Sequence, residues 1–224
     1  MITFLGAVWP ASLTPKGVVA QGCLYDHTLD ATTLSFLPDQ LQFAAPKRQA
    51  EFLAGRACVV RALAQLGSPD TDVGIGSDRA PIWPSGVVGS ITHAKGYAAA
   101  LVALSSASHG LGIDTEQMLA DDYAAKLMPQ VGSSAEWALL LDHFPAGQAF
   151  AVLFSAKEAL YKAVYPKAQR FIGFEEVVCV ACDARTRLIT VPRDVAAKPN
   201  MMDVIAIDYV MANQRVYTLC HLTG

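Results

Sequence analysis

The chain has few charged residues and no excess of positive charge. Lys and Arg together number 17, Asp and Glu number 20, and the formal net charge is −3 at pH 7 over 224 residues. A broad basic surface is therefore excluded, and with it the class of general nucleic-acid binders. Any polyanionic ligand of this protein must be held by a few local cations.

Long apolar runs are also missing from the sequence. The longest candidate, Tyr97–Leu104, is far shorter than the ~20 residues that a membrane-spanning helix needs. The N-terminal segment is apolar, but it carries no positive residue before Lys16 and is interrupted by Pro10, unlike a secretory signal. We therefore expect a cytoplasmic protein without a membrane partner.

The cysteines do not form a disulfide framework, because there are five of them in a chain of this length. Cys179 and Cys182 have CxxC spacing, but no second pair and no histidine lies at the spacing of a zinc site. Both fall within EEVVCVACD, which is typical of a strand. We expect them to be core residues rather than a metal or redox site.

Hydrophobic residues make up 53% of the chain, as in a globular protein. Apolar residues recur at intervals of three and four from Pro46 to Leu66 and the pattern stops at Gly67, which predicts a long amphipathic helix. The Gly- and Pro-rich residues 68–86 are typical of an irregular loop. Strand-like pieces follow between residues 87 and 116.

The second half of the chain repeats this mixture of helices and strands. Residues 119–151 combine helical stretches with breaks, and four segments with alternating apolar residues follow after residue 176. Each half thus has a long helix next to antiparallel strands. We expect an α+β fold of two similar halves, residues 1–108 and 109–224.

Residues 154–163, FSAKEALYKA, place two lysines, a glutamate and a tyrosine within six positions of a predicted helix. Positions four apart share a helix face, so Glu158 lies beside Lys162, and Lys157 lies beside Tyr161. A solvated Glu–Lys pair of this kind is common and contributes roughly 0.2–0.5 kcal/mol. A functional role depends on what the rest of the chain supplies.

Residues 112–116, GIDTE, place Asp114 and Glu116 two apart on a predicted strand, so that both carboxylates lie on one face. Two like charges this close repel each other and raise a pKa unless a cation lies between them. Mg²⁺ suits this position because it binds carboxylate oxygens and keeps its other positions for water and phosphate. A solvated strand face is the simpler explanation of an isolated pair.

Residues 89–93, GSITH, end a predicted strand at a turn. Ser90, Thr92 and His93 offer hydrogen-bond donors near backbone amides, and such a turn can bind a phosphate. A histidine that is merely exposed is the alternative. A serine-hydrolase site is not expected, because the segment lacks the G-x-S-x-G pattern.

In their order along the chain, KRQAEFLAGR, APIWPSGVVGSITHAKGYAAA, GIDTE and FSAKEALYK resemble the 4′-phosphopantetheinyl transferases. The match covers about residues 46–175. It is to the longer, two-lobed Sfp-like type, and within it to the siderophore-synthetase branch, whose members carry a WP-x-G-x-VGS-x-TH segment. The resemblance implies two pseudo-symmetric α+β lobes with the active site in the cleft between them. It also implies a monomer.

The resemblance implies roles for the residues that match the family's motifs. Asp114, Glu116 and Glu158 match the metal-binding carboxylates, for Mg²⁺ or alternatively Mn²⁺. A larger set of side chains would hold the adenine and phosphate groups of coenzyme A: Arg48, Arg56, Ser90, Thr92, His93, Lys157 and Lys162. Many relatives have a further lysine in the loop before the WP segment, and Arg79 is its expected substitute here.

The implied reaction transfers 4′-phosphopantetheine from coenzyme A to a serine of an apo acyl, peptidyl or aryl carrier protein. It releases 3′-phosphoadenosine 5′-phosphate. Glu158, or a metal-bound water that it orients, would accept the serine proton, and Lys162 would complete the phosphate clamp. A Mg²⁺-dependent nucleotide pyrophosphohydrolase is the alternative enzyme. A non-catalytic module that binds coenzyme A or a carrier is the alternative from another class.

Overall fold

The computed structural model describes residues 1–6, 14–26, 28, 30–192 and 204–223. Helices and antiparallel strands are mixed along the chain, so the predicted α+β class is confirmed. The chain divides into two compact units, Met1–Ser108 and His109–Gly224. Each unit has its own sheet and its own long helix.

The first unit contains a four-stranded antiparallel sheet in the order β1-β2-β6-β5. Its strands are β1 (Ile2–Gly6), β2 (Val18–Tyr25), β5 (Val87–Ala94) and β6 (Tyr97–Leu104). The hairpin of β5 and β6 confirms the strand prediction for this region. Strands β1 and β2 were not predicted.

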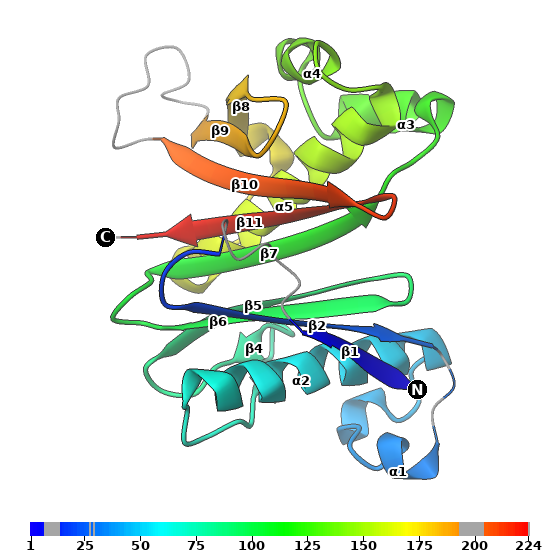
Figure 1. Cartoon of the computed structure of the whole chain (residues 1–224), viewed down its shortest axis with the longest axis vertical. Coiled ribbons are helices and arrows are strands. Elements are labelled where there is room, and N and C mark those ends of the chain that lie inside the picture. The colour runs from blue at the N-terminus through cyan, green and yellow to red at the C-terminus, as the bar shows by residue number, and fades with distance from the viewer. Residues whose placement is uncertain (7–13, 27, 29, 193–203, 224) are drawn as a thin grey trace. The chain divides into compact units, whose positions relative to one another are not determined.

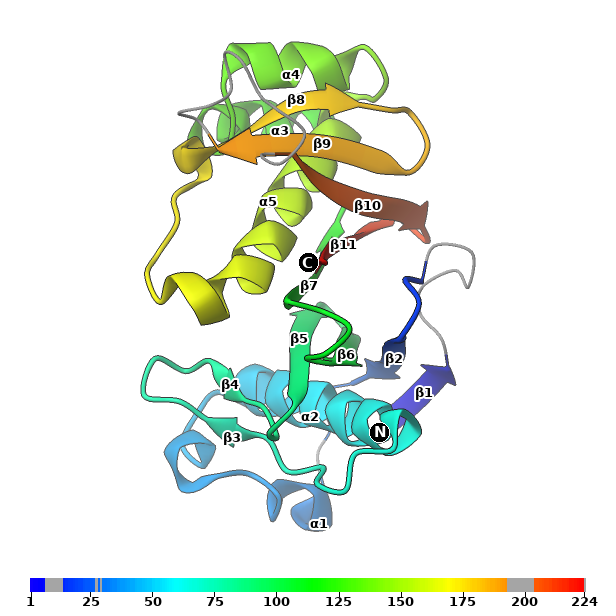
Figure 2. The ribbon, with the colours of Figure 1, turned by 90° about the vertical axis from the view of Figure 1, so that its left-hand side faces the viewer.

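Helix α2 (Pro46–Leu66) packs on one face of this sheet and confirms the predicted helix (Figure 2). Proline suits the first helical position, where its missing N–H has no partner to lose. Gly67 ends the helix with a φ of 80°, a left-handed conformation that favours glycine. The contact is made mainly by small residues, among them Ala54 and Cys58 of the helix and Ala98 and Ala100 of the sheet.

The loop predicted between α2 and β5 contains a short two-stranded ribbon, so the expectation of an irregular segment was only partly right. The ribbon pairs β3 (Gly74–Ile75) with β4 (Pro81–Ile82). Two further short elements precede α2: α1 (Ala31–Leu34) and the 3-10 helix η1 (Asp39–Leu41).

The second unit contains a five-stranded antiparallel sheet in the order β7-β11-β10-β9-β8 (Figure 1). The strands are β7 (Gly110–Gln117), β8 (Val177–Cys182), β9 (Arg187–Pro192), β10 (Ile205–Ala212) and β11 (Arg215–Leu222). The four strands predicted near the C-terminus are confirmed. Strand β7 does not extend the β5–β6 hairpin and pairs instead with β11.

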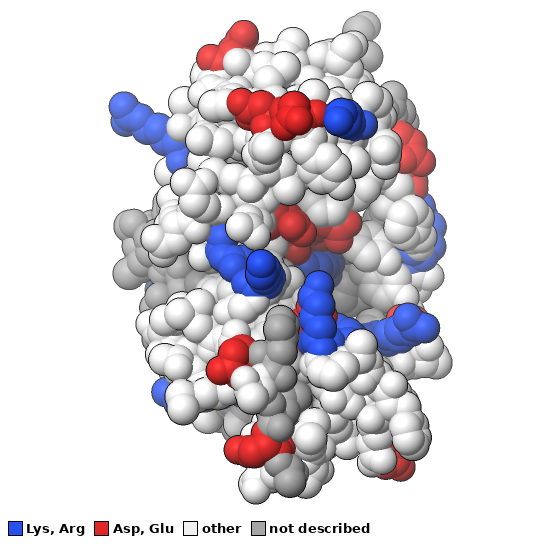
Figure 3. All heavy atoms as spheres, turned by 90° about the vertical axis from the view of Figure 1, so that its right-hand side faces the viewer, with Lys and Arg blue, Asp and Glu red and all other residues white. Residues whose placement is uncertain are grey.

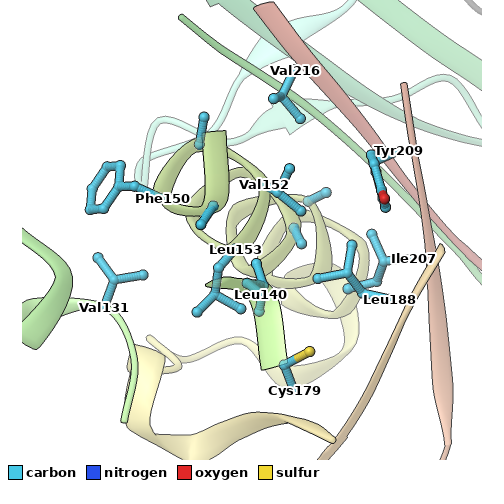
Figure 4. Close-up of a cluster of buried hydrophobic side chains, with 14 of the residues drawn as sticks. Val131, Leu140, Phe150, Val152, Leu153, Cys179, Leu188, Ile207, Tyr209 and Val216 are labelled. Atoms are coloured by element: carbon cyan, nitrogen blue, oxygen red, sulfur yellow. The ribbon is translucent and has the colours of Figure 1, made fainter. Parts of the chain in front are cut away.

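Helix α5 (Ala146–Ala168) is the central element of the second unit's core. Its apolar side chains Phe150, Val152 and Leu153 lie among residues of the sheet and of α4 (Figure 4). The helix begins directly after Pro145, so the predicted break at this proline is its start. The remaining elements are α3 (Asp121–Leu127), η2 (Met128–Gln130), α4 (Ser134–Leu141) and η3 (Phe174–Glu176).

The cysteines of the chain are all free thiols. Cys179 is buried in strand β8 and Cys182 is half-buried at its end, which agrees with the prediction of core residues. In the part of the chain that the structure describes, no helix has the length and apolarity needed to cross a membrane.

Strand β7 approaches helix α5 so closely that side chains are excluded from the contact. A Cβ atom on Gly112 would overlap the carbonyl oxygen of Ala159, and one on Gly110 would overlap that of Ala163. Alternate residues of a strand share a face, so Asp114 and Glu116 lie further along this same face. The close backbone contact therefore places both carboxylates beside the helix.

We predict that Gly112→Ala lowers the free energy of unfolding by ~3 kcal/mol, because a backbone carbonyl cannot rotate away as a side chain can. The matched control is Gly74→Ala, where an added Cβ would meet only Ile82 atoms at 3.6 Å or more. Urea denaturation of both variants measures the difference. Equal stability of the two variants would show that α5 can move away from β7 at little cost.

Candidate active site

The acidic residues singled out in the sequence come together in the second unit. Asp114 of β7 is buried, and Glu116 of β7 and Glu158 of α5 are half-buried. Lys162 lies one helical turn after Glu158, and its Nζ donates to Asp114 Oδ1 at 2.7 Å and to the Ile113 carbonyl at 3.1 Å. The lysine of the FSAKEALYK segment thus joins the helix to the acidic strand.

These carboxylates have more negative charge around them than a single lysine compensates. Burial is the main cause that raises the pKa of Glu116 to about 7, and the charges of Asp114 and Glu158 act in the same direction, against Lys162 and Arg215. The pKa of Glu158 is also raised, mainly by burial, with Lys162 opposing and Asp114 adding to the shift. The group would therefore be stabilised by a further cation.

The chemistry of this donor set suits a hard divalent ion, because it offers only carboxylate oxygens, from two elements. Within the described residues, however, no three His, Cys, Asp or Glu side chains lie close enough together to hold a metal ion. Lys162 contacts the Asp114 oxygen Oδ1 in this structure. Asp114, Glu116 and Glu158 thus fit a metal by their chemistry, but they are not arranged as a finished metal site.

Lys157 does not contact these carboxylates, and its expected contact with the coenzyme A phosphates stays a prediction. The side chain is buried, with Nζ 2.8 Å from Glu136 Oε1, 2.9 Å from the Val131 carbonyl and 2.8 Å from the Phe174 carbonyl. An ammonium group has three donors, and here all three have partners. Helical spacing gave the direction of this side chain along α5 but could not show that a buried glutamate lies opposite.

The first unit contains a cavity of about 650 Å³ that gathers four of the predicted coenzyme A residues. Arg48 and Arg56 reach it from α2, as their spacing of eight positions allows, Arg79 from the β3–β4 turn, and His93 from β5. Figure 3 shows a face on which charged side chains form only small groups, as the low charge of the chain predicts. Local cations around one cavity are what an anionic ligand would need here.

Ser90 and Thr92 are not among the residues that line this cavity, and their expected place on the adenine side of coenzyme A stays a prediction. They are buried on β5, and residues at even positions of this strand face away from the side that carries Ile91 and His93. The GSITH segment therefore divides its polar residues between the two faces of the sheet. Only the face of β5 that carries Ile91 and His93 lines the cavity.

Glu51 is a cavity residue that the sequence did not suggest. It is buried, and its Oε2 lies 3.7 Å from His93 Nδ1 and 3.9 Å from Arg48 NH1. Arg48 NH1 is also 3.1 Å from His93 Nε2. Because arginine only donates hydrogen bonds, Nε2 must accept, and the ring proton then lies on Nδ1, toward Glu51. The carboxylate thus lies beside both Arg48 and His93 and orients their side chains.

Arg56 is held on two sides and keeps one donor without a partner. Its NH2 donates to the Gly74 carbonyl at 3.0 Å, and its guanidinium carbon lies 5.0 Å from the centre of the Phe52 ring. Its NH1 is buried and has no hydrogen-bond partner among the described residues. A buried donor of this kind is costly unless a ligand or water accepts from it. The NH1 group of Arg56 can therefore donate a hydrogen bond to an anion in this cavity.

A cation-lined cavity, and a group of carboxylates with a lysine, have the chemistry to bind a phosphorylated compound and a divalent ion. Comparison with known proteins agrees with this chemistry. The model of the 4′-phosphopantetheinyl transferase N-terminal domain matches residues 37–103, and that of the 4′-phosphopantetheinyl transferase superfamily matches residues 110–210. The chain belongs to the 4′-phosphopantetheinyl transferase superfamily, which confirms the resemblance seen in the sequence.

Individual proteins are also similar to this chain. The 4′-phosphopantetheinyl transferase PptT of Mycobacterium tuberculosis is 35% identical over 178 residues, which are 78% of this chain and 75% of that protein. Enterobactin synthase component D of Escherichia coli O157:H7 is 38% identical over 185 residues, 81% of each protein. The 4′-phosphopantetheinyl transferase Npt of Nocardia iowensis is 42% identical over 130 residues, 58% of each.

We predict that Glu116 makes the metal-free protein less stable as the pH rises from 4.5 to 7. Its folded-state pKa of about 7 lies above the ordinary value of 4.5, so the folded state binds this proton more tightly than the unfolded chain does. Below pH 4.5 the Glu116 carboxyl is mainly protonated in both the folded and the unfolded state. Above pH 7 it is mainly ionised in both, and the free energy of unfolding is lowered by the full cost of ionising it in the folded state. The cost is ~1–2 kcal/mol after allowance for partial exposure.

Glu116→Gln should therefore raise the melting temperature at pH 8 and leave it nearly unchanged at pH 4.5, measured with a chelator present. Glu175→Gln, at an exposed position, is the control and should not alter the pH profile. A gain for Glu116→Gln of the same size at both pH values would contradict the electrostatic explanation.

Proposed function

We propose that the protein transfers 4′-phosphopantetheine from coenzyme A to a serine of an apo carrier protein. The serine oxygen forms a bond to the β-phosphorus, the bond from that phosphorus to the bridging oxygen breaks, and 3′-phosphoadenosine 5′-phosphate leaves. The contact of Lys162 with Asp114 carries the proposal, because it joins the two motifs that hold the acidic trio. All three carboxylates are present, whereas a module that only binds would not need them.

The cavity of the first unit is our proposed site for the nucleotide end of coenzyme A. Arg48 and His93 lie side by side at this cavity, and the buried NH1 of Arg56 has no hydrogen-bond partner among the described residues. Such groups suit a 3′-phosphate, because guanidinium donors match phosphate oxygens. Arg79 adds a further cation at the cavity wall.

At the reacting end, Asp114, Glu116 and Glu158 would hold Mg²⁺ or Mn²⁺. When bound, such an ion would offset charge on the pyrophosphate and on the leaving group. Lys162 provides a positive point charge for a phosphate oxygen. Glu158 is our candidate for the base that accepts the serine proton, because its raised pKa brings it closer to neutral pH.

A second cavity, of about 180 Å³, lies beside Glu158 in the second unit. Its walls are mainly apolar and include the side chains of Tyr161, Phe171 and Phe174. The pantetheine arm is uncharged and carries methyl groups, so this cavity has the chemistry to receive part of it. The phosphate-binding side chains and the apolar walls would then hold different parts of one substrate.

The transfer is tested by incubating the protein with Mg²⁺, coenzyme A and a panel of apo carriers, followed by mass spectrometry of the carriers. We predict a gain of one phosphopantetheinyl group on the carriers that are substrates. Asp114→Ala and Glu116→Ala should remain folded and lose the transfer, because each removes a proposed ligand. Coenzyme A cleavage without carrier modification would favour a pyrophosphohydrolase instead.

The proposed 3′-phosphate contact makes a separate prediction. Arg48→Ala or His93→Ala should raise KM for coenzyme A more than it lowers kcat, since the 3′-phosphate does not react. The loss should be roughly ten- to hundredfold, as for hydrogen bonds to a charged group. Dephospho-coenzyme A, which lacks this phosphate, should be a poor substrate of the wild type, and the variants should discriminate much less.

Lys47→Ala is the matched control, because Lys47 lies 3.8 Å from Glu51 but does not line the cavity. It should keep the wild-type preference for coenzyme A. An unchanged preference in the Arg48 and His93 variants would remove the 3′-phosphate from this cavity.

A further inference from the structure

The ion pair of Glu136 and Lys157 is the most deeply buried charged contact among the described residues, with the two residues 1% and 4% exposed. Every oxygen of Glu136 has partners. Oε1 accepts from Lys157 Nζ at 2.8 Å and from the Cys179 amide at 3.0 Å. Oε2 accepts from the Ser133 amide at 2.8 Å and from the Ser133 hydroxyl at 2.9 Å.

The pair connects five segments of the second unit. Glu136 belongs to α4 and contacts its N-cap Ser133 and the backbone of β8. Lys157 belongs to α5 and holds the carbonyl groups of Val131 and of Phe174, the first residue of η3. No charge of the pair is left for a ligand. Its contacts are all internal.

Stability alone does not explain such a pair, because the loss of hydration of two buried charges often cancels their attraction. Apolar residues of similar volume frequently do as well or better. Fixed hydrogen bonds, however, define positions more narrowly than apolar contacts do. The hypothesis to test is therefore that the pair fixes the positions of the segments it connects.

Three of the segments that the pair connects, α5, η3 and β8, also line the cavity beside Glu158. That cavity is lined by Lys157 and Glu158 of α5, by Phe171 and Phe174 of the following loop, and by Val177 of β8. Lys157 ties α5 to the Phe174 carbonyl, and Glu136 ties Lys157 to β8. Hydrogen bonds of the pair therefore run from α5 to Phe174 and to β8, on different sides of the cavity.

We propose that Glu136 is a positioning residue for the transfer: acting through Lys157, it fixes the wall of the cavity beside Glu158 and so the reacting end of coenzyme A. This inference rests on the proposed function. It assigns Lys157 an internal role rather than a direct contact with phosphate.

Three variants test the proposal: Glu136→Gln, Lys157→Met and the double variant. Glu136→Gln leaves a buried ammonium without a counter-charge, so it should be strongly destabilised. The double variant has no uncompensated charge and should regain much of the lost stability. The measurements are the melting temperature, kcat and KM for coenzyme A with an apo carrier, and the affinity for 3′-phosphoadenosine 5′-phosphate, which has no pantetheine arm.

If the pair positions the cavity wall, the double variant should be folded and yet have a kcat/KM for coenzyme A that is roughly ten- to hundredfold lower, as expected when reacting groups are misplaced. Its affinity for 3′-phosphoadenosine 5′-phosphate should match the wild type. Glu136→Asp keeps the negative charge and should therefore be more active than Glu136→Gln.

Two results would overturn the proposal. Wild-type kcat/KM in a stable double variant would show that the pair has only a structural role. An equal loss of affinity for coenzyme A and for 3′-phosphoadenosine 5′-phosphate in Lys157→Met would show that Lys157 contacts the nucleotide phosphates itself. A wild-type protein that modifies no carrier would instead refute the proposed function, and the positioning role with it.

Discussion

The backbone contact between β7 and α5 is the constraint on which the second unit depends. Gly110 and Gly112 leave no side chain between the strand and the helix, and the neighbouring residues on α5 are alanines. Asp114 and Lys162 are 48 positions apart in sequence, and the close packing lets their side chains form a hydrogen bond. Thr218, which pairs with Asp114 across the sheet, also bonds Ser155 of the same helix. The positions of the carboxylates on β7 and α5 are therefore fixed by the packing of the strand against the helix.

Much of the fold could be predicted, because local periodicity carries the information. The helix at residues 46–66 and the strands at 177–182 and 187–192 have the expected spacing of apolar residues. Strand β2 was missed because its partner β6 lies far along the chain, and its own residues, VVAQGCLY, alternate poorly. The partner of β7 could not be predicted for the same reason. The pseudo-symmetry of the two halves and a site in a cleft between them stay predictions.

The candidate site could be predicted where residue type and spacing decide, and not where a buried partner decides. Asp114 and Glu116 share a strand face by simple alternation, and that expectation holds. Glu136 has a sequence signal, since Ser133-x-x-Glu136 is a capping box, but that motif indicates a helix start and not a counter-ion for Lys157. Glu51 gave no signal at all, because an acidic residue on a basic helix face looks like an ordinary surface pair.

The contacts of His93 have a consequence for proton balance. Because Nε2 accepts from Arg48, the ring proton lies on Nδ1, toward Glu51. A phosphate dianion can only accept hydrogen bonds, so a ring that faced it through Nε2 would need a second proton. Binding of such an anion would then take up a proton from solution, and Glu51 is placed to balance the new charge. The affinity of this cavity for the dianion would then fall as the pH rises.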